Sequence, residues 1–179
     1  MYLVSVYFDD KSNKIISDYI NKIAQKTGNT FMTDNHVPPH LTIMSVEARE
    51  EDKLTEVMGK VERYLTKGQI QLVSVGVLLP YVLYVTPVLN LYLEDMIEQV
   101  HDMVKHIPEV RMSRYYQPMQ WLPHITLGKK LSKEQNNDLS QWAESFAYLA
   151  RTYGRDSDET FKWFKYYFRE GLIPANVAL

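Results

Sequence analysis

The chain has 179 residues, enough for one well-packed domain or for two small lobes that share a core. Hydrophobic residues make up 45% of it and charged residues 23%, as in ordinary globular proteins, and the formal net charge is only −2. That charge argues against electrostatic capture of long DNA or RNA, and the absence of cysteine excludes disulfides, thiolate metal sites and a cysteine nucleophile.

The hydropathy pattern predicts no membrane segment. The first ten residues lack a basic region and already reach Asp9 and Asp10, unlike a signal peptide. The longest apolar run, about residues 73–93, is interrupted by two prolines, a glycine and an asparagine, which makes it a poor transmembrane helix. We therefore expect a soluble, cytoplasmic protein without a membrane partner, and we favour a monomer.

The first half of the chain alternates strand and helix patterns. Residues 2–8 alternate as a strand does, and Asp9, Asp10 and Ser12 offer the start of a helix that Gly28 would end. The next three segments are predicted as a loop, a strand and a helix, at residues 29–39, 40–46 and 50–66.

The second half opens with two strands, residues 69–78 and 81–85, which a tight turn around Pro80 would join as an antiparallel hairpin. Asn90 can cap a helix that stops before Pro108. Three segments follow, predicted as a loop with partial strand character, a strand, and a helix opened by a Ser-x-x-Gln capping box, at residues 110–122, 124–129 and from Ser132.

The first 150 residues thus contain an approximate repeat of strand, helix, strand and helix, with an extra strand between the halves. Because the hairpin requires antiparallel pairing, we predict an α+β fold rather than a doubly wound parallel sheet. We assign residues 1–150 to one domain and residues 151–179 to a C-terminal extension. A capping box at Asp156 and aromatic residues at helical spacing predict a helix over residues 157–170, which would pack on the body or form a dimer contact.

One five-residue pattern occurs in both halves of the chain. Pro39-His40-Leu41-Thr42-Ile43 is matched by Pro123-His124-Ile125-Thr126-Leu127, each reading Pro-His-apolar-Thr-apolar. In a strand, residues two apart share a face, so each His is expected to lie beside its Thr, with the apolar residues on the other face. We expect the fold to bring these two His/Thr pairs together.

Two such pairs suit phosphodiester chemistry. Histidine exchanges protons near neutral pH, so one imidazole can take a proton from an attacking hydroxyl or water while the other gives a proton to the leaving oxygen. Two threonine hydroxyls, about 6–7 Å along the strand from the histidines, can bind the non-bridging oxygens. This chemistry needs no metal and no cofactor.

Two other chemistries have less support. Asp34 and His36 precede His40 and could add metal ligands, but two histidines without a fixed third donor form a thin ligand set. No serine lies in a nucleophile-elbow context, which argues against a serine hydrolase.

At this point the sequence resembles the 2H phosphoesterase superfamily, named for two His-x-Thr/Ser-x motifs, and within it the LigT-like branch, often labelled the 2′-5′ RNA ligase family. The resemblance rests on Pro38-Pro39-His40-Leu41-Thr42-Ile43 and on His124-Ile125-Thr126-Leu127-Gly128, and it covers about residues 1–150. It implies a bilobal α+β fold with pseudo-two-fold symmetry, in which two antiparallel-rich sheets with outer helices surround a central cleft. The extra C-terminal helix predicted here departs from that family, whose members usually end in a further strand.

The resemblance also implies an activity. Family members hydrolyse 2′,3′-cyclic phosphates, cut 2′-5′ or 3′-5′ linkages at RNA ends, or join 2′-5′ ends reversibly. It makes His40 and His124 the acid/base pair, in either order, and Thr42 and Thr126 the groups that hold the phosphate. The expected partner is a nucleotide or RNA end.

Several residues near the second motif are candidates for substrate binding. Tyr115, Tyr116 and Trp121 precede it and can stack a base, or can simply be packed aromatics. Arg114 can meet a phosphate, and strand alternation places Lys130 on the His124 face.

The leading hypothesis is therefore a metal-independent cyclic or 2′-5′ phosphodiesterase. A nucleotide- or RNA-end-binding module with little turnover is the alternative, although binding alone does not need two titrating histidines. A third hypothesis is an interaction protein that uses the aromatic tail.

Overall fold

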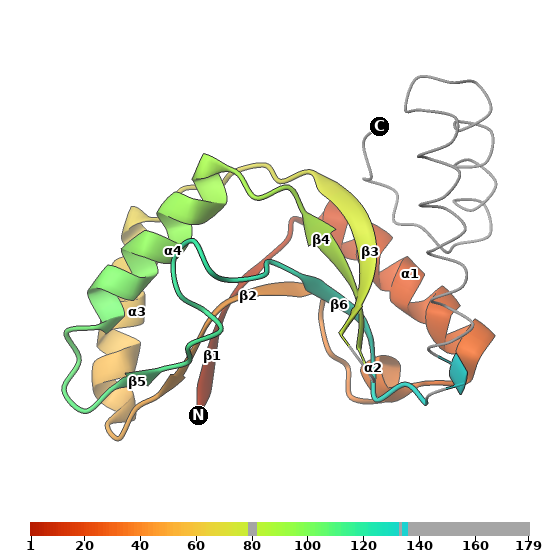
Figure 1. Cartoon of the computed structure of the whole chain (residues 1–179), viewed down its shortest axis with the longest axis horizontal. Coiled ribbons are helices and arrows are strands. Elements are labelled where there is room, and N and C mark those ends of the chain that lie inside the picture. Colours follow the sequence, from red (N-terminus) through yellow and green to blue (C-terminus); the bar gives the residue numbers. More distant parts are fainter. Residues whose placement is uncertain (79–81, 133, 136–179) are drawn as a thin grey trace. The chain divides into compact units, whose positions relative to one another are not determined.

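A computed structural model of the chain describes residues 1–78, 82–132 and 134–135 (Figure 1). These residues form an α+β structure with antiparallel strand pairing, as predicted from the hairpin. The chain divides into two compact units. Unit 1 comprises Met1–Val6, Leu41–Ile70 and Val88–Pro123, and unit 2 comprises Tyr7–His40, Gln71–Pro87 and the described residues from His124 onward.

Unit 1 combines three strands with two helices. The strands are β1 (Tyr2–Tyr7), β2 (His40–Glu47) and β5 (Arg111–Met112), and the helices are α3 (Glu51–Tyr64) and α4 (Leu91–Val104). The last residue of β1, Tyr7, and the first of β2, His40, belong to unit 2. Strand β2 lies between β1 and the short antiparallel β5, and α3 lies beside α4 (Figure 1). The buried side chains of the unit include Leu41, Ile43, Leu54, Val61, Leu93, Ile97, Val100 and Trp121.

Unit 2 is a three-stranded antiparallel sheet with helices on it. The strands are β3 (Leu72–Leu78), β4 (Val82–Pro87) and β6 (Ile125–Lys129), in the order β6-β4-β3, and the helices are α1 (Asp10–Thr27) and α2 (Phe31–Asp34). Helix α1 packs against β6 (Figure 1). The buried side chains include Ile16, Ile20, Ile23, Leu83, Val85, Ile125 and Leu127, so one apolar layer separates the sheet from α1.

The helix ends follow the capping residues seen in the sequence. The Asp9 side chain accepts a hydrogen bond of 2.9 Å from the Ser12 amide, and Gly28 ends α1 with a φ of 69°, a conformation that other residues adopt at a cost. The Asn90 side chain accepts a hydrogen bond of 3.0 Å from the Leu93 amide at the start of α4. These side chains pair backbone N–H groups that a helix start otherwise leaves without an acceptor.

Most predicted elements are confirmed to within a few residues, including the partial strand character of residues 110–122, and one short helix was missed. The expected loop at residues 29–39 contains α2, a single turn anchored by the buried Met32, and the segment before β6 contains β5. Both are too short to show a hydrophobic period. The predicted capping box is present, because Ser132 and Gln135 each accept a hydrogen bond from the other's amide. The rest of that helix and the predicted helix at residues 157–170 lie outside the described residues.

Among the described helices, none combines the length and the apolar character that crossing a membrane requires.

The cap of α4 gives a test of the fold. We expect Asn90→Ala to lower the free energy of unfolding by about 1 kcal/mol, because the Leu93 amide loses its acceptor. Asn90→Ser keeps a capping oxygen and should cost much less. Urea unfolding followed by circular dichroism measures both, and equal losses in the two variants would contradict a role for the cap.

Candidate active site

The two motifs begin at equivalent places on two strands. His40 is the first residue of β2, and His124 immediately precedes β6. Thr42 and Thr126 follow two residues later on the same strands. His40, His124 and Thr126 belong to unit 2, and Thr42 belongs to unit 1.

The predicted alternation is present on β6. Ile125 and Leu127 are 0% and 2% exposed and lie in the apolar layer, whereas His124 and Thr126 are partly exposed. On β2 both faces are largely covered, and Thr42 itself is only 8% exposed. On β6, the alternation of side chains along the strand is therefore enough to direct His124 and Thr126 away from the core.

A backbone hydrogen bond fixes the proton position on His40. Its Nδ1 lies 2.8 Å from the carbonyl oxygen of Pro38, two residues earlier. A carbonyl only accepts, so Nδ1 must carry a proton, and in the neutral ring Nε2 carries the lone pair. Nε2 is therefore the atom through which His40 can exchange a proton with a substrate.

Thr42 contacts a hydroxyl from the neighbouring strand. The Ser5 Oγ of β1 lies 3.3 Å from the Thr42 Oγ1, and either hydroxyl can donate. Because a hydroxyl has one hydrogen and two acceptor positions, Thr42 can accept from Ser5 and still donate its own hydrogen elsewhere.

Each motif histidine lies near a tyrosine. The ring centroids of Tyr7 and His40 are 6.4 Å apart with an interplanar angle of 50°. The rings of Tyr84 and His124 are closer, at 5.4 Å, and meet edge to face at 68°. The Tyr84–His124 pair has the geometry that aromatic rings prefer.

Lys130 does not continue the alternation of β6. The strand ends at Lys129, and Lys130 has a φ of 57°, outside extended geometry. Its Nζ lies 4.5 Å from the centroid of the Phe31 ring, and its carbonyl accepts a hydrogen bond of 2.9 Å from the Asn29 side chain. The described contacts of Lys130 are thus with the α2 region.

The other predicted substrate-binding residues lie in the segment after β5, in unit 1. Tyr115 is 67% exposed, and its hydroxyl accepts a hydrogen bond of 2.9 Å from Arg114, whose guanidinium also lies over the ring. Tyr116 is half-buried, and burial raises the pKa of its hydroxyl. A stacking role for Tyr115 and Tyr116 stays a prediction, with Tyr115 offering the more accessible ring.

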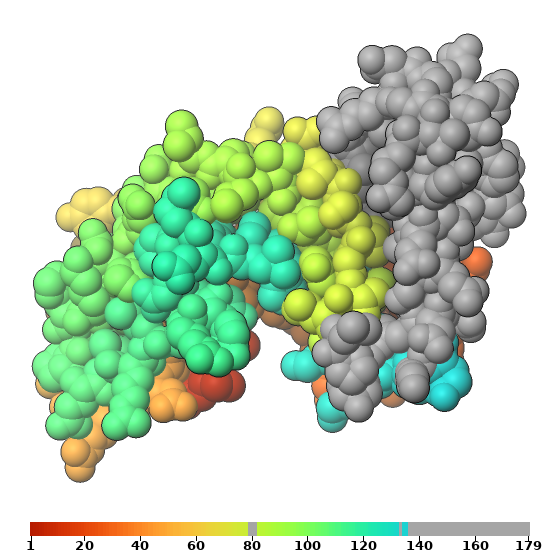
Figure 2. Space-filling model, in the orientation of Figure 1, coloured from red at the N-terminus to blue at the C-terminus, as the bar shows by residue number. Residues whose placement is uncertain are grey.

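Trp121 is held in the interior of unit 1. It is 5% exposed, and its Nε1 donates to the Glu94 carboxylate of α4 at 3.3 Å. The other Glu94 oxygen accepts a hydrogen bond of 3.0 Å from the Met119 amide. The buried Glu94 carboxylate therefore links the segment before the second motif to α4. Figure 2 shows this segment next to α4. Packed in this way, Trp121 offers little ring surface to a base.

Asp34 and His36, the possible extra metal ligands, lie at and just after the end of α2. The Asp34 carboxylate accepts a hydrogen bond of 2.6 Å from the Thr30 hydroxyl, and His36 has a φ of 50°. Within the part of the chain that the structure describes, no group of three or more His, Asp or Glu side chains is arranged to hold a metal ion.

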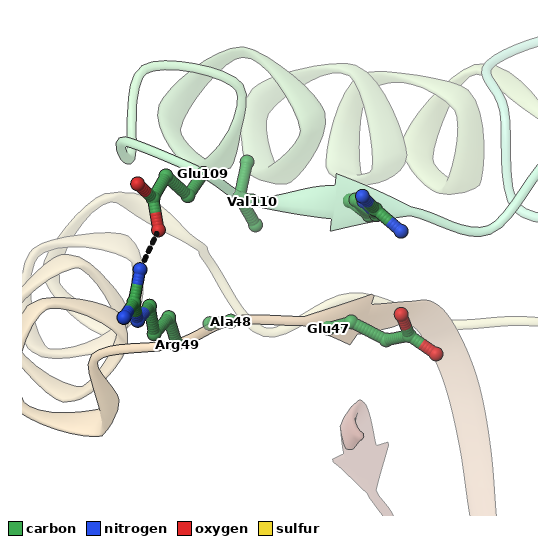
Figure 3. Close-up of a pocket in the computed structure, with 6 residues that line it drawn as sticks. Glu47, Ala48, Arg49, Glu109 and Val110 are labelled. Carbon is green, nitrogen blue, oxygen red and sulfur yellow. Dashed lines mark hydrogen bonds and ion pairs between the residues drawn. The ribbon is translucent and has the colours of Figure 1, made fainter.

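An open groove on unit 1 has a different character. It encloses about 460 Å³ and is lined by Glu47, Ala48, Arg49, Glu109, Val110 and Arg111 (Figure 3). Arg49 and Glu109 form an exposed ion pair of 3.2 Å across it, and Glu47 faces Arg111 in the β2–β5 pairing. Its charges are balanced, and exposed pairs of this kind contribute little energy.

Sequence reasoning missed the groups that surround the motif residues. Ser5, Tyr7 and Tyr84 are ordinary strand residues in the sequence, and Glu94 has no motif around it. Only Gly76 carried a signal, because a glycine inside a strand often marks a close approach of another group. Ser5, Tyr7 and Tyr84 lie near the motif residues because of strand pairing between segments that are distant in the sequence, and local sequence patterns do not reveal such pairing.

Comparison with known proteins found no match to this chain among protein-family models or among curated proteins.

The Glu94 contacts predict how the loop before the second motif responds to mutation. In Glu94→Ala the buried Trp121 indole and the partly buried Met119 amide lose their acceptor, so we expect a loss of about 1–3 kcal/mol in the free energy of unfolding. Tryptophan fluorescence should shift to the red as Trp121 becomes hydrated. Glu98→Ala, an exposed position on the same helix, serves as the control. Equal behaviour of the two variants would contradict the anchoring role.

Proposed function

We propose that this protein is a metal-independent phosphodiesterase of the 2H, LigT-like type. Its substrate is a nucleotide or RNA end that carries a 2′,3′-cyclic phosphate or a 2′-5′ linkage, and the same site can act as a ligase when an RNA hydroxyl, in place of water, attacks the cyclic phosphate. The observation that carries the proposal is the duplicated Pro-His-apolar-Thr-apolar motif at the starts of two strands, β2 and β6. The bilobal, pseudo-symmetric 2H fold is part of the proposal, and the division into two compact α+β units is compatible with it.

The proposed reaction uses the two imidazoles in opposite protonation states. One neutral histidine takes a proton from the attacking water as the new P–O bond forms, and the protonated histidine gives its proton to the ribose oxygen as the old P–O bond breaks. The products are a phosphate monoester and a free hydroxyl. On His40 the exchanging atom is Nε2, because Nδ1 is bonded to the Pro38 carbonyl.

The threonines have a separate task in this scheme. The non-bridging oxygens gain charge as the attacking oxygen approaches phosphorus, and fixed hydroxyl donors stabilise that charge. Thr42 can do so while it accepts from Ser5, and Thr126 lies on the same face as His124. Hydroxyls connected in a chain polarise one another, which strengthens the terminal donor.

The alternative is a module that binds a nucleotide or RNA end with little turnover. A binding site needs donors for the phosphate but no group that changes protonation. The His40 geometry, with Nε2 left to exchange a proton, favours the enzyme.

The first experiment offers 2′,3′-cyclic nucleotides and 2′-5′ and 3′-5′ oligonucleotides to the protein in EDTA. We expect turnover with a bell-shaped pH dependence, because the reaction needs one neutral and one protonated imidazole. His40→Ala and His124→Ala should each lower kcat by about three orders of magnitude or more. His106→Ala, an exposed histidine on unit 1, should leave kcat unchanged.

Two results would count against the proposal. Binding of every substrate without turnover would favour the alternative, and loss of activity in EDTA would remove the metal-free mechanism.

The hydroxyl contact gives a second prediction. Ser5→Ala should lower kcat about 3- to 10-fold, the equivalent of one ordinary hydrogen bond, with KM little changed. Thr42→Ala should cost more, and adding Ser5→Ala to it should cost nothing further, because Ser5 acts through Thr42. Steady-state kinetics of the wild type, the two single variants and the double variant measures this. If the two substitutions lower kcat by factors that multiply in the double variant, Ser5 does not act through Thr42.

A further inference from the structure

The strand pairing of unit 2 lines up residues from three strands on one face. Gly76 of β3 is the direct partner of Tyr84 of β4, and Tyr84 is the direct partner of Thr126 of β6. Strand alternation adds His124, two residues before Thr126, to the same face. A glycine, a tyrosine and the second His/Thr motif therefore share one surface of the sheet.

The Tyr84 ring lies over Gly76. A Cβ atom at position 76 would come within 2.5 Å of both the Cζ and the hydroxyl oxygen of Tyr84, a separation that real atoms do not tolerate. No other residue type fits beneath the ring as it stands, and Gly76 has no positive φ that would explain the glycine instead. The space left by the missing side chain is occupied by the tyrosine.

The same ring meets the imidazole of His124 edge to face, with centroids 5.4 Å apart. A contact of this kind is energetically favourable, so it favours one orientation of the imidazole. A bulge falls between Leu83 and Tyr84 in the β4–β6 pairing, and bulges of this kind redirect side chains next to functional sites.

We propose that Tyr84 is a positioning residue that orients His124 for proton transfer, and that Gly76 is required because it leaves the space that the tyrosine ring occupies. The inference rests on the proposed phosphodiesterase function. Reacting groups that are misplaced by about 1 Å can lose about a hundredfold in rate, so a ring that restricts His124 should act on kcat rather than on substrate binding. The role belongs to the ring, not to its hydroxyl.

The kinetic test compares Tyr84→Leu, Tyr84→Phe and Gly76→Ala. We expect Tyr84→Leu to lower kcat about 10- to 100-fold with KM little changed, and Tyr84→Phe to stay close to the wild type. Gly76→Ala should lower kcat because the new methyl group displaces the ring. In the double variant Gly76→Ala/Tyr84→Leu the glycine substitution should have no further effect, since it acts only through the tyrosine.

Gly68→Ala is the matched control. Its new Cβ would meet the ring of Tyr92 at 2.4 Å, so it displaces a tyrosine in the same way, but that tyrosine contacts neither motif histidine in the described contacts. We expect its kcat to be unchanged. Circular dichroism confirms that each variant is folded before its kinetics are compared.

A second readout does not depend on activity. In proton–carbon NMR spectra of the full chain with labelled histidine, the ring current of Tyr84 should displace the His124 resonance. That displacement should disappear in Tyr84→Leu, change in Gly76→Ala and persist in Gly68→Ala.

The outcomes separate the two proposals. If the wild-type protein turns over none of the substrates, the proposed function is contradicted. The NMR spectra alone then test whether Tyr84 contacts His124. An active wild type with unimpaired Tyr84→Leu overturns the positioning role. So does a Tyr84→Phe variant as slow as Tyr84→Leu, a double variant whose effects multiply, or a His124 resonance that ignores Tyr84.

Discussion

In an extended strand every second side chain leaves the same face, and the candidate site depends on that period. The period places His124 with Thr126 on one face of β6 and sends Ile125 and Leu127 into the apolar layer under α1. The buried residues fix the register of the strand, since a slip of one residue would put the histidine in the core. The packing of the core and the presentation of the polar pair are therefore one constraint.

The elements and the motif faces could be predicted because they depend on local patterns. Asp9, Gly28 and Asn90 mark helix ends through their own side chains or backbone preference, and the His-x-Thr spacing marks a face whatever the strand pairs with. The partners of the motif residues could not be predicted in this way. Ser5 reaches Thr42 only because β1 lies beside β2, and nothing near either residue in the sequence specifies that pairing.

Trp121 and Lys130 show a second reason for the limits of sequence patterns. An aromatic residue beside a motif is compatible with stacking and with packing, and the outcome here follows from Glu94, 27 positions earlier, whose carboxylate accepts a hydrogen bond from the indole. Alternation placed Lys130 on the His124 face, but alternation holds only while the strand continues, and β6 ends one residue before. The position of the Lys130 side chain depends on where β6 ends, and that of Trp121 depends on a partner residue on α4.

The two motifs are nearly identical in sequence, and a different tyrosine lies near each of their histidines. The Nδ1 of His40 is hydrogen-bonded to the Pro38 carbonyl, and the Tyr84 ring meets the His124 imidazole edge to face. A carbonyl acceptor fixes the proton on one nitrogen, and a ring contact fixes the orientation of the plane. Proton transfer needs a defined proton position and a defined orientation of the imidazole, and these two contacts bear on one requirement each of the proposed reaction.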